Sequence, residues 1–184
     1  MMKKIITLVL FAVFVNSYAQ QNTINWVTLD EAIKLQAKSP KKIMMDVYTN
    51  WCGPCKMLDK NTFHNPDVVD YVNKNFYAVK FNAEGNDVIN FKGNTFSNSG
   101  YDPALANRRN SAHEFTSFLK VRAYPTIVFF DENLDVIAPV RGYQKPQQLE
   151  LYLKLFNSDD YQSMSTQEDF NAYYNSFTPT FRGK

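Results

Sequence analysis

The feature that most constrains the fold is an apolar segment that leads directly into a pair of cysteines. Residues 42–48 (Lys-Ile-Met-Met-Asp-Val-Tyr) are almost continuously apolar, which predicts a central β-strand covered on both faces. A helix is predicted to begin at about Cys52, within the Trp-Cys-Gly-Pro-Cys-Lys segment at positions 51–56. We therefore expect an α/β protein whose cysteines lie at a strand-to-helix junction.

The position of the two cysteines suits thiol chemistry. A thiolate, not a thiol, attacks disulfides, and the free N–H groups and dipole of a helix N-terminus stabilise negative charge. Cys52 lies where this field is strongest, so we expect it to be the nucleophile. Cys55 is one turn further and is placed to attack the mixed disulfide and release the substrate. Pro54 is tolerated in the first helical turn, and Gly53 places no side chain beside the reactive sulfur.

Two other uses of the cysteine pair fit the sequence less well than redox chemistry. Zinc requires about four ligands, but the chain contains two cysteines in all, and its two histidines, His64 and His113, lie far from them in sequence. A purely structural disulfide that closes so short a loop would remove little chain entropy. We therefore expect a redox function for the pair, with no metal and no cofactor.

Asp46 interrupts the apolar strand before the cysteines. A desolvated carboxylate has a raised pKa and can accept a proton near neutral pH, so Asp46 could deprotonate Cys55 directly or through a water molecule. The alternative is that Asp46 only caps a backbone donor. Lys80, in a strand predicted over 76–81, would modulate the charge of Asp46 if the two side chains share a face; a solvated lysine is the alternative.

The rest of the chain alternates between helices and strands. Capping residues and apolar spacing predict helices over 28–38, 65–72, 113–121 and 146–156, and strands over 126–130 and 136–140 that form a hairpin. The segment 84–111 contains six Asn and three Gly, and we expect an insertion with at most short helices and little apolar surface for the core. Tyr124-Pro125-Thr126 enters a strand through a proline, for which a cis bond is one explanation.

A final helix is predicted after a capping box at Ser165–Glu168. Its aromatic residues recur at helical spacing, and they pack either on the flank of the domain or on a partner. They are Phe170, Tyr173, Tyr174 and Phe177.

The N-terminus has the pattern of a secretory signal peptide over residues 1–19. Lys3 and Lys4 precede an apolar run of eleven residues, Ile5–Val15, which is too short to span a bilayer. We expect cleavage after Ala19, export, and no stable membrane insertion. Without those two lysines the 20 basic residues fall to 18, equal to the 18 acidic ones, so the mature chain has little net field for binding nucleic acid.

The motifs together resemble the thioredoxin family over residues 24–156. The resemblance rests on residues 42–56, on Tyr124-Pro125-Thr126 and on Gly142 after the last hairpin. Residues 62–67 (Thr-Phe-His-Asn-Pro-Asp) are more similar to exported thioredoxin-like proteins and to the periplasmic domain of membrane thiol-disulfide reductases. The resemblance implies an α/β thioredoxin-like fold, with a mixed central sheet flanked by helices, over 20–157, an insertion at 84–111, and a C-terminal helical extension at 158–184.

The same resemblance implies roles for the site residues. Cys52 would be the nucleophile, Cys55 the resolving thiol and Asp46 a buried acid–base group, with a cis peptide before Pro125. An extended substrate could pair beside Cys52 at this proline. The substrate-contact residues would be Trp51, Gly53, Pro54, Tyr124 and Pro125.

We therefore expect an exported, periplasmic thiol-disulfide oxidoreductase that exchanges its dithiol with protein disulfides. Reduction or isomerisation is favoured, because Gly-Pro between the cysteines resembles the reducing members of the family. An exported reductase would need an electron donor in the membrane or periplasm. The alternative is a thioredoxin-like binding or assembly factor that uses the insertion and the aromatic C-terminal helix, without required redox turnover.

Overall fold

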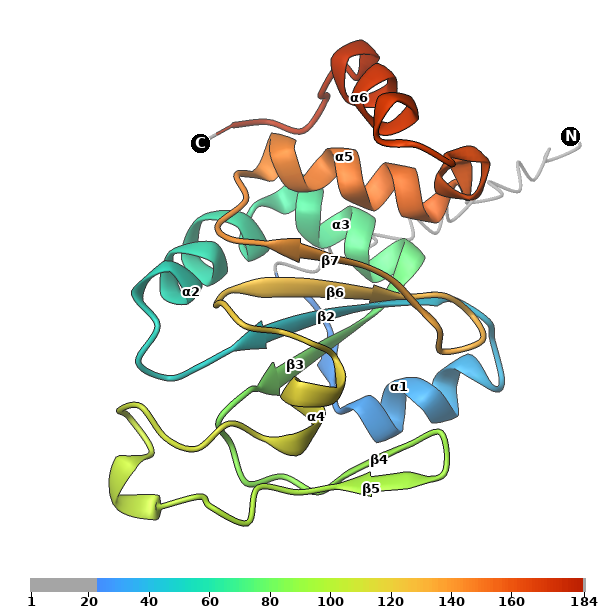
Figure 1. Cartoon of the computed structure of the whole chain (residues 1–184). Coiled ribbons are helices and arrows are strands. Elements are labelled where there is room, and N and C mark those ends of the chain that lie inside the picture. Colours follow the sequence, from blue (N-terminus) through green and yellow to red (C-terminus); the bar gives the residue numbers. More distant parts are fainter. Residues whose placement is uncertain (1–22, 184) are drawn as a thin grey trace, which may run out of the picture.

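The computed structural model describes residues 23–183, so the predicted signal peptide lies outside the described residues. A five-stranded sheet with the order β1-β3-β2-β6-β7 forms its centre (Figure 1). β3 is parallel to β1 and β2, whereas β6 is antiparallel to both β2 and β7, so the sheet is mixed as expected. The strands are β1 (Trp26–Val27), β2 (Lys42–Tyr48), β3 (Phe76–Asn82), β6 (Thr126–Phe130) and β7 (Val136–Arg141).

Helices cover both faces of this sheet (Figure 1). One face packs against α3 (Pro66–Asn75) and α5 (Pro146–Asn157), and the other against α1 (Leu29–Gln36) and α4 (Glu114–Phe118). Met44 belongs to the first core, and its neighbours Ile43 and Met45 belong to the second. Both faces of β2 are therefore buried, which confirms the predicted reason for its apolar sequence.

Local signals set the ends of the helices. Thr28 and Glu31 form a capping box at the start of α1, and the Asn65 side chain caps α3, which begins with Pro66. Within residues 23–183 no helix is long and apolar enough to cross a bilayer.

The segment 84–111 differs from its prediction. It contains a hairpin of β4 (Ile89–Phe91) and β5 (Asn94–Phe96), followed by a short 3₁₀ helix (Pro103–Leu105). Phe91 is 2% exposed, and its ring contacts Phe115 and Phe130. The expectations of at most short helices and of little apolar contribution to the core were wrong, because three-residue strands are too short to show an alternating pattern.

The C-terminal helix α6 (Gln167–Ser176) lies over α5 (Figure 1). Its capping box is formed by Thr166 and Asp169, one residue later than predicted, since Asp169 and not Glu168 reaches back to the backbone at the helix start. The Phe170 ring stacks on Tyr152 of α5, so the aromatic residues pack on the flank of the domain, although Tyr174 remains 53% exposed.

The segment after α6 is attached to the domain by two carboxylates. The buried Glu150 carboxylate accepts hydrogen bonds from the backbone N–H groups of Thr180 and Phe181. Burial raises the pKa of Glu150, but hydrogen bonds from Lys154 and Thr180 offset this effect and hold the pKa below its ordinary value. The Arg182 side chain also forms an ion pair with Asp67 of α3.

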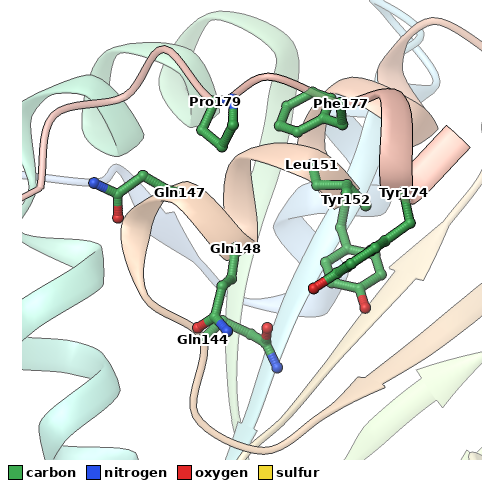
Figure 2. Close-up of a pocket in the computed structure, with 8 residues that line it drawn as sticks. All are labelled: Gln144, Gln147, Gln148, Leu151, Tyr152, Tyr174, Phe177 and Pro179. Carbon is green, nitrogen blue, oxygen red and sulfur yellow. The ribbon is translucent and has the colours of Figure 1, made fainter.

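A pocket of about 290 Å³ lies between α5 on one side and α6 with the segment after it on the other (Figure 2). Glutamine amides and aromatic rings line it, among them those of Gln144, Gln148, Tyr152, Tyr174 and Phe177. Neither cysteine lines this pocket, so it is separate from the candidate active site.

Candidate active site

Cys52 and Cys55 form a disulfide at the N-terminus of α2 (Gly53–Leu58). Cys52 is the N-cap residue, and its Sγ accepts a hydrogen bond from the backbone N–H of Cys55 at 3.1 Å. Pro54 lies in the first helical turn, and apart from its chain neighbours Cys52 and Pro54 no residue has an atom within 4 Å of the position that a Cβ on Gly53 would occupy. The Cys52 sulfur is therefore held at the end of the helix that stabilises a thiolate.

Both cysteines are buried in the disulfide form. Cys52 is 2% exposed and Cys55 is 6% exposed, whereas Gly53 and Pro54 between them are exposed. The covalent bond joins the two sulfurs on one helical turn, so they share the same buried environment.

Asp46 lies on β2, on the sheet face that packs against α3 and α5. Its side chain is buried, and its Oδ1 atom has no hydrogen-bond partner among the described residues. Burial raises the pKa of Asp46 from 3.8 to about 7; the positive charge of Lys80 lowers this pKa and the negative charge of Asp59 raises it. A carboxyl group with this pKa can exchange a proton near neutral pH.

Lys80 is the register partner of Asp46 on the neighbouring parallel strand β3. Its ammonium group forms an ion pair with Asp59 and lies 5.0 Å from the ring centroid of Trp26. Asp59 was missed from the sequence. It begins a π-helical turn that follows α2 directly, and its spacing of four residues from Cys55 is the signal that could have placed it on the same helical face.

A cavity of about 230 Å³ connects these groups. Asp46, Cys55, Asp59 and Lys80 all line it, together with Thr49, whose buried Oγ1 has no partner among the described residues. A polar cavity of this size can hold water molecules. A proton could therefore move between Cys55 and Asp46 through this cavity.

The proline segment lies beside the cysteines. The Tyr124–Pro125 peptide bond is cis, as the resemblance implied, and Pro125 is buried. The Tyr124 ring packs edge-on against the Trp51 ring, with centroids 6.2 Å apart. The Tyr124 ring therefore contacts the residue that directly precedes Cys52.

The segment 84–111 adds residues around Trp51 that the sequence did not reveal. The Trp51 Nε1–H donates to Glu84 Oε2 at 2.7 Å, and the Arg109 guanidinium lies over the indole ring at 4.9 Å. The Asn50 side chain donates to the backbone carbonyl of Ala106. The positions of Glu84, Ala106 and Arg109 in the sequence do not indicate these contacts, because the packing of a long loop brings the three residues to the site.

The mixed sheet, the cysteine pair at a helix N-terminus and the cis-proline define the class of thioredoxin-fold proteins. Residues 29–157 match the family model of the thioredoxin-like domain. The chain belongs to this thioredoxin-like family.

Individual proteins agree with this assignment. The chain is 28% identical over 123 residues to the thiol:disulfide interchange protein DsbD of Pectobacterium atrosepticum, a match that covers 66% of this chain and 17% of that protein. A thioredoxin-fold protein from Helicobacter pylori superposes with a TM-score of 0.59 at 19% identity, over 86% of this chain and 93% of that one. A thioredoxin from Thermus thermophilus superposes with a TM-score of 0.54 at 14% identity, over 73% of this chain and 87% of that one.

Proposed function

We propose that this chain is an exported, periplasmic enzyme that reduces or isomerises disulfides in other proteins. The observation that carries the proposal is the cavity behind the disulfide, where Cys55 and an Asp46 carboxyl with a pKa of about 7 lie together. The thioredoxin-like family and the similarity to DsbD support the same activity. Export is supported by the signal-like pattern of residues 1–19.

The proposed reaction begins with the reduced protein. The Cys52 thiolate attacks a partner disulfide, forms a mixed disulfide and releases one partner sulfur as a thiolate. The Cys55 thiol then gives its proton to Asp46, directly or through water in the cavity. The Cys55 thiolate attacks Cys52 Sγ, which forms the Cys52–Cys55 disulfide and releases the second partner sulfur. Two electrons pass from the dithiol to the partner.

The residues around the disulfide have supporting roles in this proposal. Lys80 adjusts the proton affinity of Asp46 through its positive charge. Gly53 and Pro54, which directly follow Cys52, are exposed, so a partner can contact the chain beside the nucleophile. Trp51, Tyr124 and the backbone that precedes the buried Pro125 form the surface on which an extended partner segment lies. A reduced donor in the membrane or periplasm regenerates the dithiol.

A trapping experiment tests these roles. In Cys55→Ser the second attack is lost, so mixed disulfides through Cys52 should accumulate, whereas Cys52→Ser should trap no partner in this way. Trapping by Cys52→Ser with none by Cys55→Ser would reverse the assignment. If Cys52→Ser keeps full biological activity, the protein is instead a binding or assembly factor.

The direction of exchange is tested by the reduction potential. A value close to that of thioredoxin, about −270 mV, supports a reductase, and a value near that of strong oxidants, about −120 mV, would contradict it. Asp46→Asn should slow turnover near neutral pH while the fold stays intact. Equal exchange rates for both proteins from pH 6 to pH 9 would exclude proton transfer by Asp46.

A further inference from the structure

The inference concerns Arg109, an exposed residue of the segment 84–111. Its guanidinium carbon lies 4.9 Å from the centroid of the Trp51 ring, one residue before Cys52 in sequence. A guanidinium over an indole face is held there by a cation–π interaction. A positive charge is therefore held over the side chain of the residue that directly precedes Cys52.

Trp51 is itself held firmly in place. Its Nε1–H donates to Glu84 Oε2 at 2.7 Å, and the same oxygen accepts a hydrogen bond from the Asn110 backbone N–H at 2.9 Å. The Tyr124 ring packs against the indole from another segment. Glu84 thus binds the indole N–H, and the Arg109 guanidinium lies over the ring.

The donors of this guanidinium are free. A guanidinium carries five N–H donors in one plane, and these can bind a carboxylate in a bidentate arrangement. Among residues 23–183 the Arg109 side chain makes no hydrogen bond and no ion pair. Arg182 shows the contrast, because its guanidinium is already bound to the Asp67 carboxylate.

We infer that Arg109 determines substrate specificity by binding an aspartate or glutamate side chain that lies beside the reactive cysteine of a partner. This inference rests on the proposed exchange function. Glu84 is a positioning residue, because it holds Trp51 and, through it, Arg109. Among residues 23–183 the Glu84 carboxylate makes no ion pair with Arg109, and its Oε2 is bound to Trp51 and Asn110.

The test uses two disulfide peptides that differ only in a Glu or a Gln next to one cysteine. For the wild-type protein we expect kcat/KM to favour the Glu peptide by about tenfold, or about 1.4 kcal/mol. Arg109→Gln should abolish this preference, chiefly through KM, and keep the rate with the Gln peptide. Arg109→Lys should retain only part of the preference, because an ammonium lacks the two-pronged geometry.

Matched controls distinguish recognition by Arg109 from a general effect of positive charge near the site. Arg108→Gln removes the same charge from the neighbouring exposed residue and should keep the preference. Glu84→Gln retains an oxygen acceptor for Trp51 and should also keep it, whereas Glu84→Ala should reduce it. The inference is overturned if wild type shows no preference, if Arg109→Gln keeps it, or if Arg108→Gln loses it equally.

A binding measurement makes the test independent of the exchange reaction. Calorimetric titration of the oxidised protein with the same peptides, their cysteines replaced by serine, requires no redox step. If the wild-type protein binds the Glu peptide more tightly than the Gln peptide, and Arg109→Gln abolishes this difference, carboxylate recognition is supported. That conclusion would hold even if the protein exchanged no disulfide. Equal affinities for the Glu and Gln peptides would refute it.

Discussion

Asp46 should make the oxidised protein less stable as the pH rises. Burial raises the pKa of Asp46 from 3.8 to about 7 in the folded chain. Between these values the folded state binds a proton at Asp46 that the unfolded state releases. The stability contributed by this proton is fully present below about pH 4 and is lost as the pH rises through about 7.

The size of this effect follows from the two pKa values. At pH 5 the folded Asp46 is almost fully protonated, and at pH 8 it is mostly ionised, whereas in the unfolded chain it is ionised at both. At 1.36 kcal/mol for each tenfold change, the free energy of unfolding should fall by about 2 to 3 kcal/mol between pH 5 and pH 8. Asp46→Asn removes the titrating proton, so this part of the pH dependence should disappear.

The assay is urea unfolding at several pH values with the disulfide intact. Glu168→Gln removes a charge from an exposed site and should keep the wild-type pH dependence. Lys80→Met removes the positive charge that lowers the pKa of Asp46, so the loss of stability should move to higher pH. The reasoning is refuted if Asp46→Asn keeps the wild-type slope, or if Lys80→Met moves the transition to lower pH.

Two further predictions concern segments outside the disulfide. Phe91→Ala should destabilise the protein by about 3 to 5 kcal/mol because Phe91 belongs to the core, whereas Val88→Ala at a 59% exposed position should change stability by less than about 0.5 kcal/mol. If urea unfolding gave similar losses of stability for both variants, a core role for the hairpin would be contradicted. Removal of residues 178–184 should cost about 2 kcal/mol or more, because the buried Glu150 loses the donors of Thr180, whereas removal of 183–184 alone should have little effect. An unchanged melting temperature after the longer truncation would show that this attachment adds no stability.

The sequence by itself determined the central strand, most helix ends and the place of the cysteines. These features have local causes. The apolar run in 42–48 results from burial on both faces, and the caps at Thr28 and Asn65 act within a single helical turn. The raised proton affinity of Asp46 was predictable for the same reason, because a carboxyl group in a doubly buried strand is desolvated wherever the other elements pack.

Only the tertiary structure decided which groups surround the cysteines. Lys80 faces the same side as Asp46 because β2 and β3 pair in a particular parallel register, and Asp59 reaches Lys80 because a π-helical turn follows α2. Glu84 contacts Trp51 across 33 residues of chain, and Arg109 covers the same ring from the far end of the loop. Contacts between distant residues depend on how whole elements pack together, and no local pattern of residues encodes that packing.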